Sequence, residues 1–113
     1  MSKRLPKVIL IDMIDAIEHL AEYIQGVSFE EYLKNRKLRD AVYHNIIVLG
    51  EASNRLEESF LQGHPEIEWH KMISTRNAII HGYDEIDDKI IWSIIKNILP
   101  DLKIKLETLL ATL

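Results

Sequence analysis

Three residue types that suit phosphate chemistry lie within eight consecutive positions of the chain. Arg76, His81 and Tyr83 belong to the segment Arg76-Asn77-Ala78-Ile79-Ile80-His81-Gly82-Tyr83. An arginine is permanently cationic and can grip a phosphate with two parallel N–H donors. A histidine can take or give a proton near neutral pH. Such a set suits cleavage of RNA without a metal ion, because the ribose 2′-hydroxyl supplies the nucleophile.

Each side chain has a distinct role in that reaction. His81 would act as the general base on the 2′-hydroxyl or as the general acid on the leaving oxygen. Arg76 would stabilise the charge of a phosphorane-like transition state. Asn77 would fix the phosphate or orient His81. The same trio also fits ordinary structure, with a histidine at a helix end, a surface arginine and a packed tyrosine, and the residues alone leave both interpretations open.

The elements that must position this segment are predicted to be helices. The chain of 113 residues has 47% hydrophobic residues, four glycines and three prolines, and shows no alternating strand pattern. A first helix should begin near Pro6 and end before Gly26. Ser28 and Glu31 form a capping box for a short helix through Leu33. The buried stripe of the first helix should comprise Ile9, Met13, Ile17, Leu20 and Ile24.

A long helix is predicted from Leu38 to Phe60, followed by a turn at Gly63-His64-Pro65. The motif helix should run from Ile67 to Ile80 or His81, with Gly82 as its cap. Asp84 or Asp87 should open the last helix, which Pro100 should kink or split. The apolar residues expected inside that last helix are Ile90, Ile91, Ile94, Ile95 and Ile98. The pattern predicts one all-α domain over residues 1–113, an up-and-down bundle of four principal helices plus a short helix.

Helix geometry limits how Arg76 and His81 can act together. Five residues correspond to about 140° of rotation, so Arg76 and His81 cannot stack on one face of their helix. A symmetric homodimer would solve this problem, since a two-fold interface brings the same corner together twice. Apolar residues on more than one helix face fit such a dimer, and they fit a fully covered inner helix equally well.

Charge and composition limit the other functions. The chain has no cysteine, a formal net charge of -4 and no apolar run long enough for a membrane span, so we expect a cytoplasmic protein. Any RNA contact must then be a local basic feature. The stretch from Trp69 to Tyr83 contains Lys71 and Arg76 and no acid. A second basic run usually forms a solvated face, although it can also contact substrate phosphates; it comprises Lys34, Arg36, Lys37 and Arg39.

No metal site is predicted. The histidines other than His81 lack metal-ligand spacing, and no cysteine could complete a zinc site. The acids that follow the motif are better explained as negative charge at a helix N-terminus than as metal ligands. The two sets are His19, His44, His64 and His70, and Asp84, Glu85, Asp87 and Asp88.

The motif resembles a known family over nearly the whole chain. Its R-x4-H-x-Y pattern is similar to that of HEPN domains of the HepT-like ribonuclease toxins. Other segments resemble the same family at matching places in the chain. They are Leu49-Gly50-Glu51-Ala52, His64-Pro65-Glu66-Ile67-Glu68-Trp69, and Trp92 followed by Leu99-Pro100-Asp101-Leu102.

The resemblance implies a metal-independent endoribonuclease toxin of a HepT/MntA toxin–antitoxin pair, dimeric and without a cofactor of its own. Arg76 and His81 map onto the catalytic pair, and Asn77 maps onto the polar position after the arginine. Tyr83 maps onto the tyrosine that a partner nucleotidyltransferase modifies with AMP from ATP. Glu51 would hold an arginine of the motif helix, whereas the residues alone favour a surface pair with Arg55. The alternative function is a non-catalytic HEPN subunit that binds nucleotide or docks the transferase.

Overall fold

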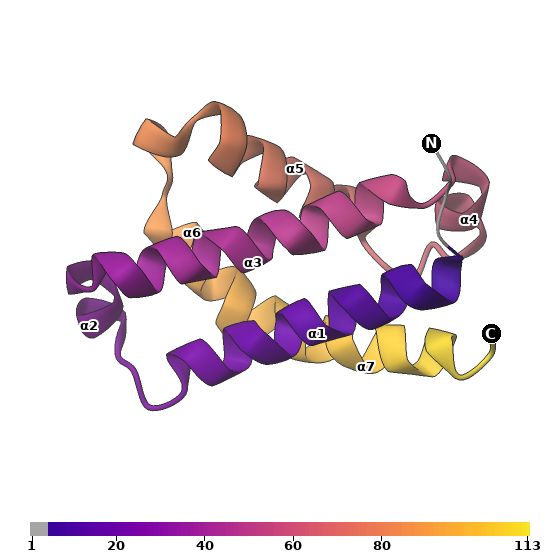
Figure 1. The fold of residues 1–113 in the computed structure, drawn as a ribbon, viewed down its shortest axis with the longest axis horizontal. Coiled ribbons are helices and arrows are strands. Elements are labelled where there is room, and N and C mark those ends of the chain that lie inside the picture. The colour runs from indigo at the N-terminus through magenta and orange to yellow at the C-terminus, as the bar shows by residue number, and fades with distance from the viewer. Residues whose placement is uncertain (1–4) are drawn as a thin grey trace.

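The computed structural model describes residues 5–113, apart from the side chain of Tyr83, and within this range it is built from helices. Four long stretches form the bundle (Figure 1): α1 (Pro6–Ile24), α3 (Arg36–Arg55), α5 (Trp69–His81), and a C-terminal stretch of α6 (Asp88–Ser93), a π-helical segment (Ile94–Ile98) and α7 (Leu99–Leu110). Shorter elements are α2 (Phe29–Lys34), α4 (Glu58–Gly63) and a 3-10 turn (Tyr83–Glu85). The predicted all-α bundle is confirmed.

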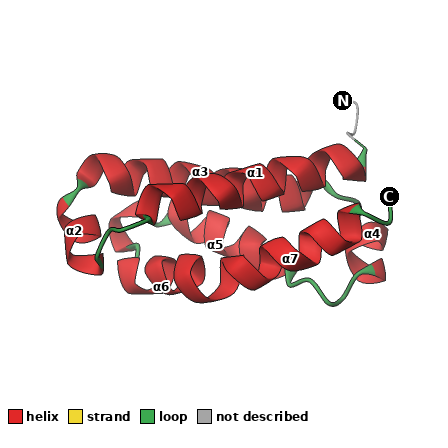
Figure 2. Cartoon of the chain, turned by 90° about the horizontal axis from the view of Figure 1, so that it is seen from below, coloured by secondary structure: helices red, strands yellow, loops and turns green. Residues whose placement is uncertain are grey.

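The bundle has two sides that enclose one core. Figure 1 shows α3 between α1 and α5, and Figure 2 shows α1 and α3 together on the side opposite α6 and α7. The closest packing joins α3 to α5 and α1 to α3. Every residue of the predicted α1 stripe is buried, and so are Val42, Ile46 and Leu49 on the inner face of α3. The helix that carries the motif is therefore positioned mainly by α3.

Local signals set the ends of the first two helices as expected. Pro6 occupies the first turn of α1, and Gly26 turns the chain with a φ of 72°, which favours glycine. The capping box is formed in both directions: Ser28 Oγ accepts from the N–H of Glu31, and Glu31 Oε1 accepts from the N–H of Ser28.

The prediction of one helix from Leu38 to Phe60 is wrong at both ends. The helix begins at Arg36, because the Asn35 side chain accepts from the N–H of Leu38 and caps it. It ends at Arg55, and the chain re-enters a separate short helix, α4. The break at Leu56 has an extended ψ of 144°. It allows Leu56 and Leu61 to be buried together, so core packing overrides helix propensity here.

The motif helix begins two residues after the predicted start. Trp69 Nε1 donates to the carbonyl of His64 at 3.1 Å and ties the first turn of α5 to the preceding loop. Phe60 packs against both rings, with centroid distances of 4.6 Å to His64 and 6.1 Å to Trp69. The end of α5 at His81 agrees with the prediction, although Gly82 has a φ of −142° and does not form a left-handed cap.

Pro100 splits the last helix as predicted. Proline lacks an N–H and its ring clashes with the carbonyl four residues earlier, and the wide π-helical segment lies immediately before it. Ile91, Ile94 and Ile95 are buried. Ile90 is 58% exposed, which contradicts the expected inner position. It lies about 100° from Ile91 around the helix and falls outside the buried stripe.

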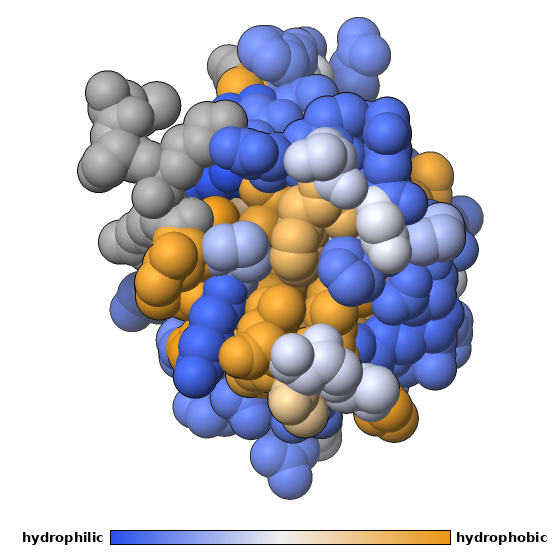
Figure 3. All heavy atoms as spheres, turned by 90° about the vertical axis from the view of Figure 1, so that its right-hand side faces the viewer, coloured by the Kyte–Doolittle hydropathy of each residue, from blue (hydrophilic) through white to orange (hydrophobic). Residues whose placement is uncertain are grey.

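The start of α1 and the end of α7 lie at one end of the bundle (Figure 1). That end carries a strip of apolar surface surrounded by polar groups (Figure 3). In residues 5–113, no helix has the length and apolar character that would let it cross a membrane.

Candidate functional site

The site begins with a close crossing of two helices at Gly50. A Cβ atom built on Gly50 would clash with the Cβ of Arg76 and lie 2.7 Å from the carbonyl oxygen of Met72. Real Cβ contacts are essentially never this short, so a side chain at position 50 would force α3 and α5 apart. The missing Cβ therefore sets the separation of the two helices at the level of Arg76.

The close crossing brings Glu51 onto Arg76. Arg76 Nη2 donates to Glu51 Oε1 at 2.5 Å, and Arg76 Nη1 donates to Asn77 Oδ1 at 2.6 Å. The role that the resemblance implies for Glu51, holding an arginine of the motif helix, is therefore confirmed: the ion pair seen for Glu51 among the described residues joins it to Arg76 and not to Arg55. The side-chain oxygen of Asn77 contacts the arginine, whereas its expected contact with the phosphate or with His81 stays a prediction.

Two hydrogen bonds hold the guanidinium of Arg76, but not all of its N–H donors have a partner. Its side chain is 22% exposed, and its Nε is buried with no hydrogen-bond partner. A buried donor without an acceptor is costly, and such groups in native proteins often mark sites of function. The two Nη contacts orient the plane of the guanidinium, and each Nη keeps a second N–H that can bind an anion.

His81 lies apart from this cluster. The residue is exposed on the last turn of α5, and no contact between His81 and Arg76 is present among the described residues. This arrangement agrees with the predicted rotation between the two positions. The side chain of Tyr83 lies outside the described residues, so the expected approach of its hydroxyl to His81 stays a prediction. Its backbone opens the 3-10 turn that follows Gly82.

A groove runs along the other side of Glu51. It has a volume of about 660 Å³ between α1 and α3, and its lining includes Asp15, His19, His44 and Glu51. Its size is typical of sites for small molecules. Glu51 therefore forms part of the groove wall while its carboxylate holds Arg76. No pattern in the sequence indicates this groove, because its walls come from two different helices, α1 and α3.

The turn after the motif is anchored by an aspartate between two tyrosines. Asp88 Oδ1 accepts from Tyr32 Oη at 2.8 Å and from Tyr43 Oη at 2.5 Å, which joins α6 to α2 and α3. Burial, helped by Asp88, raises the pKa of Tyr43 to about 12, and the same causes raise the pKa of Tyr32 well above its usual range. Sequence reasoning missed this contact, because Tyr32 and Tyr43 lie 45 or more positions from Asp88.

Several of the remaining candidates have structural partners. The Asp87 side chain accepts from the N–H of Lys89 and caps α6, as the helix-end interpretation predicts. His19 Nδ1 lies 3.4 Å from Asn45 Oδ1, and His70 lies 3.6 Å from Glu58. In residues 5–113, no group of three or more histidine or acidic side chains is arranged to hold a metal ion.

The chain is similar to one family model and to several known proteins that are named as ribonucleases. The family model described as "Ribonuclease HepT-like" matches residues 13–109. The chain is 36% identical to "Probable ribonuclease HepT" of Thermococcus cleftensis, over 95% of this chain and 97% of that protein. It is 32% identical to "Putative RNase MJ1380" of Methanocaldococcus jannaschii, over 95% and 98% respectively. No solved structure gives a significant match.

Proposed function

Because the chain belongs to the HepT-like ribonuclease family, we propose that it is an endoribonuclease toxin whose cleaving groups are Arg76 and His81. The observation that carries this proposal is the fixed guanidinium of Arg76, which still has free N–H donors, on the same helix as an exposed histidine. One group binds a phosphate and the other transfers a proton, which is the minimum that cleavage through the 2′-hydroxyl requires.

The reaction follows from the roles of the two groups. The ribose 2′-oxygen attacks the adjacent phosphorus, and the bond from phosphorus to the 5′-oxygen breaks. The products are a 2′,3′-cyclic phosphate and a 5′-hydroxyl. His81 takes the proton of the 2′-hydroxyl or gives one to the leaving 5′-oxygen. Arg76 stabilises the added negative charge on the phosphate oxygens. Neither step uses a cofactor.

The site is proposed to be complete only in a homodimer. Arg76 faces α3, whereas His81 lies exposed about 140° further around α5, so one copy does not aim both at one phosphate. A two-fold axis beside α5 would bring the His81 of one copy toward the Arg76 of the other. Exposed Ile80, next to His81, would be covered by such an interface.

Control is proposed to act through Tyr83. A partner nucleotidyltransferase of the MntA type would use ATP in the cytoplasm to modify this residue. The tyrosine oxygen attacks the α-phosphorus of ATP, the phosphodiester of an AMP group forms, and pyrophosphate leaves while the phenol loses its proton. The new phosphate would lie two residues from His81 and repel the phosphates of RNA.

Expression and RNA analysis test the proposal. Wild-type protein made without the transferase should slow growth and fragment RNA, leaving 5′-hydroxyl ends. Arg76→Ala and His81→Ala should each lose activity by about a hundredfold or more. Wild-type protein that leaves growth and RNA intact would refute the toxin function. Incubation with the transferase and ATP should add the mass of AMP to wild type and not to Tyr83→Phe.

The α1–α3 groove favours one second candidate, a non-catalytic subunit that binds nucleotide. This function predicts saturable binding of ATP or AMP to the isolated protein. It also predicts that His81→Ala has no effect on growth. The ribonuclease proposal makes the opposite prediction for His81→Ala, so the growth assay separates the two.

A further inference from the structure

We propose that Arg36 and Lys37, at the start of α3, bind the phosphates of the RNA strand that is cut at the Arg76 site. This inference rests on the proposed function, because it names where the substrate of that site runs. Both cations are exposed in a chain whose formal net charge is -4. A local basic feature is what an acidic protein needs to hold a polyanion.

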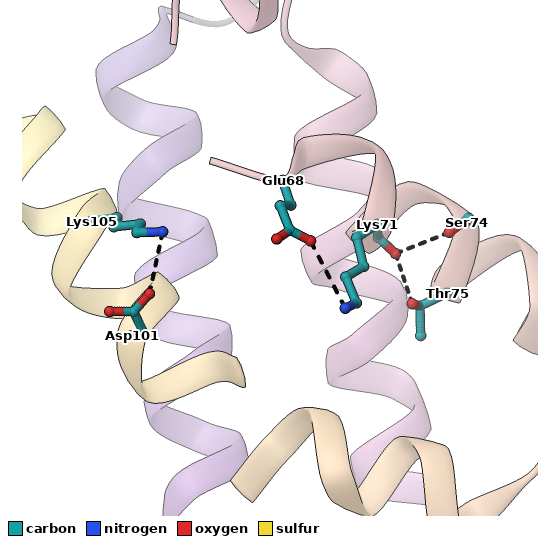
Figure 4. A network of polar contacts seen from close by, with 6 residues as sticks. All are labelled: Glu68, Lys71, Ser74, Thr75, Asp101 and Lys105. Carbon is teal, nitrogen blue, oxygen red and sulfur yellow. Dashed lines mark hydrogen bonds and ion pairs between the residues drawn. The ribbon is translucent and has the colours of Figure 1, made fainter. Parts of the chain in front are cut away.

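The two cations have no acidic partner among the described residues, whereas cations elsewhere in the bundle do. Lys71 lies 3.8 Å from Glu68, and Lys105 lies 3.3 Å from Asp101 (Figure 4). Arg76 itself is paired with Glu51. The Trp69–Tyr83 stretch, which contains Lys71 and Arg76, therefore offers less free positive charge than its sequence indicates.

Structural roles account for the neighbours of Arg36 and Lys37 but not for these two residues. Lys34 lies in the last turn of α2, where the helix dipole favours a cation. Arg39 Nη1 donates to the carbonyl of Leu33 and holds α2 against α3. Arg36 and Lys37 instead occupy the first turn of α3, where the dipole disfavours cations, and no acid offsets them in that turn. The helix dipole therefore gives no reason for two cations at this position, which points to a binding role.

The fold places this pair at the same end of the bundle as the motif turn. In Figures 1 and 2, α2 and the start of α3 lie at the left end, and Figure 1 shows the turn between α5 and α6 there too. The contacts of Asp88 with Tyr32 and Tyr43 fix that proximity. Lys37 precedes Glu51 by 14 residues on α3, so it lies roughly 21 Å from the Arg76 pair and within about 40° of the same helix face. A short single strand can span that length.

One acidic residue, Asp40, lies along this path, and neutralising it should have the opposite effect on RNA binding. Asp40 is exposed and lies within about 20° of the Glu51 face of α3. A strand that runs from Lys37 to Arg76 would pass this carboxylate. Removing its charge should therefore tighten RNA binding, while removing Arg36 and Lys37 should weaken it.

The experiment measures binding of wild-type protein to a fluorescent 2′-O-methyl RNA of about 12 nucleotides over a range of salt. This RNA cannot be cut, because its 2′-oxygen is blocked. The double variant Arg36→Gln/Lys37→Gln should weaken binding roughly tenfold near physiological salt, and should reduce the slope of log K against log salt by about 1.4. Its melting temperature should equal or exceed that of wild type. Asp40→Asn should bind a few-fold more tightly.

The matched control is Lys7→Gln/Lys105→Gln, which removes two charges at the other end of the bundle. Equal weakening by the control and by Arg36→Gln/Lys37→Gln would overturn the inference, and so would an unchanged salt slope. Unchanged RNA binding by Arg36→Gln/Lys37→Gln would overturn it as well. Wild type that cuts RNA while the two double variants bind alike refutes only this inference. Wild type that binds RNA through Arg36 and Lys37 but does not cut it refutes the proposed function and leaves the pair as an RNA-binding site.

Discussion

The two ends of the motif segment are held in different ways. Arg76 lies against α3, where Glu51 and Asn77 fix its guanidinium and the absent side chain of Gly50 allows the approach. His81 is exposed on the last turn of the same helix, one residue before a glycine. The fold therefore preorganises the group that we propose binds the anion. It leaves exposed the histidine that we propose moves the proton.

The largest effect on folding should come from filling the gap at Gly50. Gly50→Ala places a methyl group against Arg76 and the Met72 carbonyl, and such overpacking costs about 1–3 kcal/mol. Activity should fall with it, because α5 must shift. Gly63→Ala is the matched control: its φ is not positive and nothing lies within 4 Å of the added Cβ, so the free energy of unfolding should change by less than about 0.5 kcal/mol. Urea denaturation measures the free energy of unfolding of both variants. Equal losses in the two would contradict the role given to Gly50.

A smaller effect is expected when Arg76 loses its contact with Glu51 and the fold stays intact. Glu51→Ala removes a charge-assisted hydrogen bond, and kcat should fall by about tenfold or more while KM changes little. Glu51→Gln keeps an oxygen that can accept from Nη2 and should retain more activity than Glu51→Ala. Glu107→Gln, an exposed change on α7, is the control and should have no effect. Higher activity in Glu51→Ala would mean that Glu51 masks the arginine instead of positioning it.

The smallest effect is expected for the hydrogen bond between Tyr43 and Asp88, which anchors the turn after the motif. Tyr43→Phe loses its hydrogen bond to Asp88, and the free energy of unfolding should fall by about 1 kcal/mol at neutral pH. The raised pKa of Tyr43 means that the folded state favours the protonated phenol, so its contribution is complete below the ordinary pKa of 10 and is lost as pH rises toward 12. Denaturation between about pH 9 and pH 12 should show a steeper loss for wild type than for Tyr43→Phe. Parallel curves would contradict this role.

Local signals predicted most of the fold. Proline, glycine and capping residues set both ends of α1, the start of α2 and the start of α6, and the apolar spacing identified the core. The break at Leu56 was not predictable in the same way. No proline or glycine marks it, and its cause is the joint burial of Leu56 and Leu61 against other helices.

The candidate site was predictable only in part. Residue types and resemblance identified Arg76, Asn77, His81 and Glu51, and the structure shows that Glu51 reaches Arg76. The close approach at Gly50 and the contact of Asp88 with two tyrosines depend on helices that meet only after folding. Sequence spacing therefore predicts which side chains form the candidate site, while tertiary packing decides which of them is held and which is exposed.

The most direct test of the account mixes two inactive variants. Arg76→Ala and His81→Ala proteins are purified separately, unfolded and refolded together, and assayed for RNA cleavage. If each site combines Arg76 of one copy with His81 of the other, the mixture should recover about a quarter of wild-type activity, because half of the dimers are mixed and each carries one intact site. Each variant refolded alone should stay inactive. A mixture as inactive as its components, with mixed dimers present, would contradict a site shared between two copies.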